Sequence, residues 1–173
     1  MMKKLGLLLA VILVLSFAST FAAAQENKIA INPIGFLIDY ISAEFETKLG
    51  ANYSLQVGAD YWGLDLGEGF DLKAFGIGVG ARYYPSGEAL HGVYVVPSVN
   101  LAWAKGEYEG EEATVGVYGA GIAAGYQWVF RSGVTLDLGL GMGMPFHITG
   151  TEEDVEVDKK PTTSFKLGIG YAW

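Results

Sequence analysis

The amino-acid sequence predicts an all-β protein, an eight-stranded antiparallel up-and-down transmembrane β-barrel. Beyond residue 27, apolar side chains alternate with glycine or polar side chains in segments of about ten residues, which is the period of a strand. Turn residues separate these segments, and the connections are alternately short and long. The chain is also rich in apolar residues (51%) and glycine (25 residues), with 17% charged residues. Average soluble domains carry about 25% charged residues, so the composition is not typical of a soluble enzyme.

The first element along the chain is an export signal. Lys3 and Lys4 precede an apolar run over residues 5–15, and small residues close the stretch at Ala24. A basic start, a short apolar centre and a small-residue end are typical of a secretory signal peptide. The apolar centre is shorter than the roughly 20 residues that a membrane-spanning helix needs. We therefore expect a signal peptide over residues 1–24 and a barrel domain over residues 25–173.

Eight expected strands follow in chain order. The first, over residues 28–38, is less regular because Pro33 interrupts its alternation. Each of the other seven carries an apolar row on one face and glycine or polar residues on the other. The apolar rows are the odd-numbered residues of 41–49, 53–61, 75–83, 93–103 (with Pro97 inside the row) and 165–173, and the even-numbered residues of 118–130 and 136–146.

The connections between these strands alternate in length. Short turns are expected at residues 50–52, 85–90 and 131–133, and longer loops at 63–70, 105–113 and 149–161. This alternation is typical of outer-membrane barrels, whose periplasmic turns are short and whose extracellular loops are long. The connection near Asp39 and Tyr40 is an exception, because it is short on the side where loops should be long.

The two faces of such a barrel allow two orientations. With the apolar rows inside, the protein would be a soluble, lipocalin-like carrier with an exterior made mostly of glycine. Soluble surfaces depend on charge, and eight full rows of large side chains would overfill so narrow a lumen. We therefore expect the apolar rows to face lipid, with aromatic girdles near both strand ends, and the glycines and polar groups to line the interior.

The last strand carries a terminal motif. Lys166, Gly168, Tyr171 and Trp173 supply a polar residue, a glycine and two aromatic residues, the last at the end of the sequence. This pattern resembles the terminal signal of outer-membrane barrels. The resemblance implies that the barrel-assembly machinery recognises these four residues.

The chain after residue 24 is similar to small eight-stranded outer-membrane proteins of the OmpA-barrel and OmpX type. Its Asn32-Pro33-Ile34-Gly35 opening and glycine-alternating strands resemble a glycine-rich bacterial group of such barrels. The resemblance implies a location in the outer membrane of a diderm bacterium. Outer-membrane lipids and lipopolysaccharide would then be the immediate partners of the barrel.

Charged side chains on the inward faces are expected to pair across the lumen. A buried charge costs several kcal/mol unless it is paired. The members of this expected ion-pair cluster are Glu44, Glu46, Lys48, Asp60, Arg82, Asp137 and Lys166. A structural plug is the favoured interpretation, and a polar path for small solutes is the alternative.

We expect no catalytic residues, cofactor or metal. The chain has no cysteine, which excludes thiolate chemistry. His147 with Ser164 and a carboxylate would imitate a hydrolase triad, but His147 is expected to point inward, away from the lipid-facing rim where barrel enzymes that trim lipid A act. Glycine pairs at 76–78 and 119–121 match a loose dinucleotide fingerprint, yet no helix follows either pair. The net charge of −8 disfavours nucleic acid as a partner.

Two connections are strongly acidic, and their spacing matches no EF-hand. Their acidic residues are Glu107, Glu109, Glu111 and Glu112, and Glu152, Glu153, Asp154, Glu156 and Asp158. The leading hypothesis is a structural or surface-interaction role without catalysis, with these loops outside the cell. The alternatives are a narrow channel or small-ligand-binding barrel, and a soluble periplasmic lipocalin-like carrier.

Overall fold

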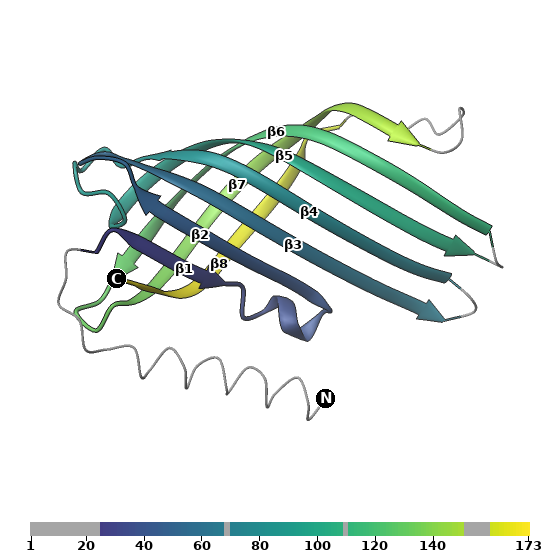
Figure 1. Ribbon diagram of the computed structural model, residues 1–173, viewed down its shortest axis with the longest axis horizontal. Coiled ribbons are helices and arrows are strands. Elements are labelled where there is room, and N and C mark those ends of the chain that lie inside the picture. Colours follow the sequence, from purple (N-terminus) through teal and green to yellow (C-terminus); the bar gives the residue numbers. More distant parts are fainter. Residues whose placement is uncertain (1–24, 68–69, 109–110, 151–159) are drawn as a thin grey trace.

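In the computed structural model, residues 25–67, 70–108, 111–150 and 160–173 are described, and eight antiparallel strands close into a barrel (Figure 1). Each strand pairs with its neighbours in the sequence, and β1 pairs with β8 to close the barrel. The strands are β1 (Asn27–Ile31), β2 (Tyr40–Lys48), β3 (Tyr53–Gly67), β4 (Phe70–Tyr83), β5 (Gly92–Tyr108), β6 (Glu111–Val129), β7 (Val134–Gly150) and β8 (Thr162–Ala172). The predicted fold class is confirmed. The expected signal peptide lies outside the described residues.

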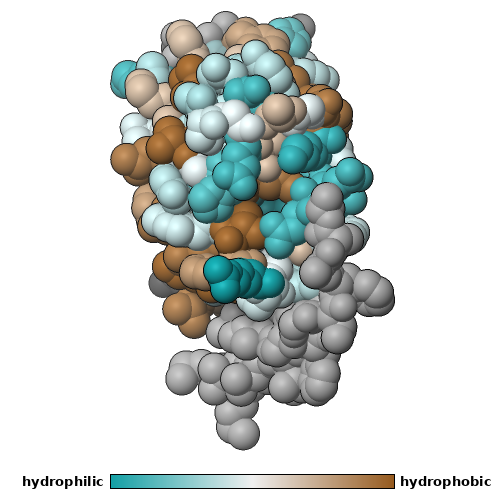
Figure 2. Space-filling view, turned by 90° about the vertical axis from the view of Figure 1, so that its left-hand side faces the viewer, coloured by the Kyte–Doolittle hydropathy of each residue, from teal (hydrophilic) through white to brown (hydrophobic). Residues whose placement is uncertain are grey.

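The two faces of the barrel follow the predicted period of two. Val57, Val79 and Val99 lie side by side on three adjacent strands, and all three are exposed on the outer surface. Arg82 and Tyr94 point inward and are fully buried. Figure 2 shows the end of the barrel with the short turns, where hydrophilic residues gather near the middle and hydrophobic residues lie toward the edge. The expected orientation, with apolar rows outside, is confirmed.

The strands are longer than expected at the opposite end. The predicted loops over residues 63–70 and 105–113 are mostly strand, because β3 and β4 pair as far as Gly67, and β5 and β6 as far as Glu111. Backbone pairing between adjacent strands continues along four strands, so their N–H and C=O groups remain bonded. These four strands project beyond β1, β2 and β8 (Figure 1). Residues 151–159 of the third predicted loop lie outside the described residues.

The first expected strand is shorter than predicted. β1 ends at Ile31, because the side chain of Asn32 accepts hydrogen bonds from the backbone N–H groups of Ile34 (3.1 Å) and Gly35 (3.2 Å), which turns the chain. A short 3-10 helix, η1 (Gly35–Leu37), follows before β2. Among the described residues, no helix has the length and hydropathy needed to cross a membrane. Three apolar side chains of this connection remain exposed: Ile34, Leu37 and Ile38.

A β-bulge in β7 changes which face His147 occupies. Pro145 pairs with Gly119 and His147 with Tyr118, so Phe146 is the extra residue. An extra residue reverses the inward and outward alternation beyond it. His147 therefore lies exposed on the outer face, with its ring 5.5 Å from that of Tyr118. The expectation that His147 points inward is wrong, and the ring lies on the opposite side of the wall from the lumen.

Candidate functional site

The lumen is crossed by a buried network of charged side chains, which we call the lumen network. Alternate residues of the strands point inward, and this parity places the members on five strands. They are Lys28 on β1, Glu44 and Glu46 on β2, Arg82 on β4, Asp137 on β7 and Lys166 on β8. Three basic and three acidic side chains make the network neutral.

Arg82 lies at the centre of the lumen network and is fully buried. Its Nη2 atom is 2.9 Å from both a Glu44 and an Asp137 oxygen, and its Nη1 atom is 3.0 Å from Glu46. The guanidinium also lies over the ring of Tyr94, 4.1 Å from the ring centroid, as in a cation–π contact. A planar guanidinium with five donors suits such a site, because each carboxylate receives its own N–H group.

Lys28 completes the network from β1. Its ammonium lies 2.8 Å from both Glu44 and Glu46 and 3.3 Å from Asp137, and it donates to the Gln127 amide oxygen at 2.6 Å. Lys28 is not in the predicted cluster, because Pro33 interrupts the alternation of the first segment. The alternation of Lys28 and Ala30 with two isoleucines was the pattern that would have revealed it.

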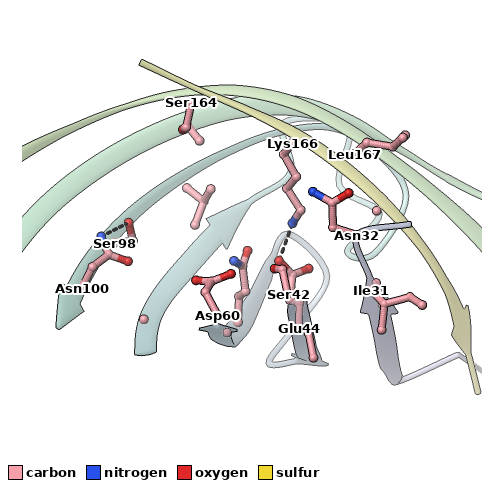
Figure 3. A pocket seen from close by; sticks show the side chains of 18 of the residues that line it. Ile31, Asn32, Ser42, Glu44, Asp60, Ser98, Asn100, Ser164, Lys166 and Leu167 are labelled. Atoms are coloured by element: carbon pink, nitrogen blue, oxygen red, sulfur yellow. Dashed lines mark hydrogen bonds and ion pairs between the residues drawn. The ribbon is translucent and has the colours of Figure 1, made fainter. Parts of the chain in front are cut away.

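Lys166 contacts the lumen network from the side away from the short turns, and its side chain is partly exposed. Its ammonium contacts Glu44, and it lies 3.0 Å from an Asp137 oxygen. Figure 3 shows Lys166 extending from β8 toward Glu44. This side chain separates the lumen network from the space above it.

Tyrosines and glycines close the remaining bore. Tyr94 donates its hydroxyl to Asp137 at 2.7 Å, and Tyr84 donates to Glu46 at 2.5 Å. A Cβ atom at Gly139 would lie 2.7 Å from the Tyr94 hydroxyl oxygen, so a larger residue there would displace the ring. Glycine on the inward face thus makes room for the large side chains that fill the lumen.

Two members of the expected cluster do not join the lumen network. Lys48 shares the inward parity of β2 but lies exposed at the end of that strand. Asp60 lies above the network and accepts a hydrogen bond of 2.6 Å from the Tyr40 hydroxyl. The structure brings the remaining five predicted residues together: Glu44, Glu46, Arg82, Asp137 and Lys166.

A cavity of about 300 Å³ lies above the lumen network. Figure 3 shows Ser42, Asp60, Ser98 and Asn100 around it, with Lys166 at its inner side. Ser164 also lines this cavity, whereas His147 lies on the outer face. The His147–Ser164 pair considered from the sequence therefore does not form. Within the described part of the chain, no group of three or more His, Asp or Glu side chains is arranged to hold a metal ion.

The terminal residues lie where the barrel closes. The backbone N–H of Trp173 donates to the Asn27 carbonyl at 2.9 Å, and its ring centroid lies 6.5 Å from that of Phe45. Gly168 pairs with Asp137, and a Cβ atom at Gly168 would lie 3.3 Å from the Asp137 Cβ. Their recognition by the assembly machinery stays a prediction.

A closed eight-stranded barrel with an apolar exterior and a filled polar lumen is a small barrel of the outer-membrane type. The family model described as "Protein of unknown function (DUF3575)" matches residues 9–164. The chain therefore belongs to this family. A search of curated proteins found no match.

Two solved structures of Ail show the same fold. The crystal structure of Ail, the attachment invasion locus protein of Yersinia pestis, matches with a TM-score of 0.53 and 11% identity over 87% of this chain and 100% of Ail. Ail in complex with the heparin analogue sucrose octasulfate matches with a TM-score of 0.54 and 12% identity over the same shares of both chains, 87% and 100%. A major outer membrane protein from Thermus thermophilus gives a TM-score of 0.46 and 16% identity over 85% and 98%. The likeness to Ail establishes the fold of a small eight-stranded outer-membrane β-barrel.

Proposed function

We propose that this protein is a non-conducting barrel of the outer membrane with a structural or surface-interaction role and no catalytic activity. The observation that carries this proposal is the lumen network, which fills the bore with six buried or partly buried charged side chains and leaves them mutually paired. An eight-stranded lumen is only wide enough for side chains to fill it. The exposed apolar belt and the signal-like residues 1–24 support export to the outer membrane of a diderm bacterium, among its lipids and lipopolysaccharide.

The surface role rests on the extended end of the barrel. β3 to β6 project beyond the other strands there (Figure 1), and the acidic residues Glu107, Glu111 and Glu112 lie on the last part of β5 and the first part of β6. Glu109 and the acidic residues at 152–158 lie outside the described residues. The net charge of −8 favours cationic partners, or lipopolysaccharide bridged by divalent cations, over a polyanion such as the one in the Ail complex.

Conductance tests the plug directly. We expect the wild-type protein in a planar lipid bilayer to pass no resolved current, because ions would have to displace the lumen network. Replacing Arg82 and Glu46 together by serine removes one cation and one anion, keeps the network neutral, and should open a small current. Migration on a detergent gel with and without heating verifies that the variant is folded. Steady single-channel current through the wild type would favour the narrow channel instead.

The terminal motif gives a second expectation. Replacing Trp173 by alanine should lower the amount of barrel in the outer membrane of expressing cells, because the final aromatic residue is part of the proposed assembly signal. The measurement is immunoblotting of outer-membrane fractions.

The matched control for Trp173 is Trp128→Ala, at the same end of the barrel on β6. It removes an aromatic ring that packs 4.4 Å from the ring of Tyr126, and it leaves the terminus intact. Equal losses for both variants would indicate a general loss of girdle packing and would contradict a terminal signal.

A further inference from the structure

Among the described residues, the barrel wall is incomplete beside β8. The pairing of β1 with β8 ends at Ile31 and Ile169, while β8 continues to Thr162 and β2 continues to Tyr40. Beyond that level, no described strand pairs with the free edge of β8. Figure 1 shows β8 and β2 diverging toward this end. A strand edge at bilayer depth is tolerated only where it lines a polar or water-filled space.

The cavity above the lumen network borders this break. Inward-facing side chains such as Ser42, Asp60 and Ser98 line it. Residues of the strands beside the break also border it: Ile31 on β1, Ala43 on β2, and Phe165 and Leu167 on β8. Since no described strand lies between β8 and β2 at this level, this side of the cavity lies next to the gap in the wall.

An apolar connection lies beside the break in the wall. The connection between β1 and β2 borders the break, and its apolar side chains are turned outward: Leu37 is 76% exposed and Ile38 is 62% exposed. Such exposure is favourable when hydrocarbon surrounds the connection. A bilayer around the barrel would place acyl chains against this connection and the break beside it.

The polar end of the cavity has a negative excess. The lumen network is neutral, so Lys166 is already compensated by Glu44 and Asp137. Asp60 adds a further carboxylate to the lining, and among the described residues it accepts a hydrogen bond from the Tyr40 hydroxyl. A partly buried carboxylate without a cation favours a positively charged ligand group that also donates hydrogen bonds.

We propose that the gap between β8 and β2 opens sideways to the bilayer and admits a single-chain amphiphile with a protonated amine head. The ammonium lies against Asp60, where Ser42 and Asn100 offer further acceptors, and the chain leaves the barrel between Ile31 and Leu167. The cavity of about 300 Å³ is at the lower end of the range for small-molecule sites. It accommodates the head and the first carbons, and the bilayer surrounds the rest of the chain.

Photo-crosslinking tests this site. The full barrel is reconstituted in phosphatidylcholine nanodiscs and exposed to dodecylamine that carries a diazirine in mid-chain, and labelled residues are mapped by peptide mass spectrometry. Dodecanoic acid with the same diazirine is the matched probe. We expect the amine probe to label residues of β1, β2 and β8 beside the opening, and the acid probe to label the whole apolar belt without preference.

Two variants locate the head and the chain. Asp60→Asn keeps the shape of the side chain and removes its charge, so it should lower labelling by the amine about tenfold. Gly58 lines the cavity, and a Cβ atom there would have its nearest neighbour at 3.8 Å, so Gly58→Phe should fill the space and lower labelling similarly. Gly143→Phe is the control, because Gly143 also faces inward with room for a Cβ atom but does not line the cavity.

Three results would overturn the site. These are even labelling around the belt by the amine, labelling that neither Asp60→Asn nor Gly58→Phe reduces, and crosslinks that join β8 of two copies. The last result would mean that a second chain pairs with the free edge instead of a lipid-like ligand.

Discussion

Replacing Arg82 by methionine is expected to lower the free energy of unfolding by about 3 to 5 kcal/mol. The substitution keeps an apolar stem of similar length and removes the cation that contacts Glu44, Glu46 and Asp137. Those carboxylates would remain buried with an excess of negative charge, which is far more costly than the loss of a surface pair. Urea unfolding of the protein in lipid vesicles, followed by tryptophan fluorescence, measures the change.

Arg131→Met is the matched control. Arg131 is exposed in the short turn between β6 and β7, so the same change of residue type there should have little effect. The double variant Arg82→Met with Asp137→Asn should recover part of the lost stability, because it restores the charge balance of the lumen network. Equal stabilities for Arg82→Met and Arg131→Met would mean that the network does not hold the barrel together.

Replacing Val79 by arginine should cost about 2 to 4 kcal/mol if the outer surface lies in a bilayer. Val79 is 41% exposed and lies on β4 midway between Phe75 and Tyr83, whose rings contact those of Trp103 and Tyr53. Aromatic girdles mark the two interfaces of a membrane barrel, so this position falls near the middle of the hydrocarbon. Unfolding in vesicles measures the cost.

Val93→Arg provides the comparison. Val93 is also an exposed outward valine, at 52%, but it lies one residue from the start of β5, at the end of the barrel with the short turns. The cost of arginine near an interface falls to about 0 to 1 kcal/mol. Similar costs at Val79 and Val93 would argue that no hydrocarbon layer surrounds the belt, as for a soluble carrier.

The strands and their two faces were predictable because period-two alternation is local. On β4, for example, Ile77 and Val79 alternate with glycines, and both valine and isoleucine lie outside as expected. The positions where strands end were less predictable. Residues 63–70 contain turn-forming glycines, yet pairing with neighbouring strands keeps most of them extended, and such pairing depends on residues far away in the sequence.

The bulge at Phe146 could not be read from the sequence for the same reason. In the sequence, the apolar alternation continues through Met142, Met144 and Phe146. The register with β6, however, makes Phe146 an extra residue and places His147 on the outer face. A single unpaired residue does not change the types of residue found in a strand. It becomes visible only when both strands are aligned.

The sequence predicted that charged side chains would pair in the lumen, but it identified only some of the residues that do so. Alternation along the strands identified Arg82 and Asp137 as inward-facing. Alternation does not show how far along the barrel axis a residue lies, so Lys48 was included although it is exposed at a strand end. Lys28 was not predicted as a member, because Pro33, beyond the end of β1, interrupts the alternation of the longer segment. A shorter window ending at Ile31 would have placed it on the inner face.

The seam between the first and last strands sets the order of events when the chain folds. Lys28 meets Asp137 across 109 positions, and Lys166 meets Glu44 across 122. Contacts between such distant parts of a chain form slowly, so the pairs that join Lys28, Glu44 and Arg82 to Asp137 and Lys166 form only when the two ends of the protein come together. Before that, a partly formed barrel would carry incompletely paired charges into the hydrocarbon, which is costly. We therefore expect insertion into the bilayer and closure between β1 and β8 to occur together.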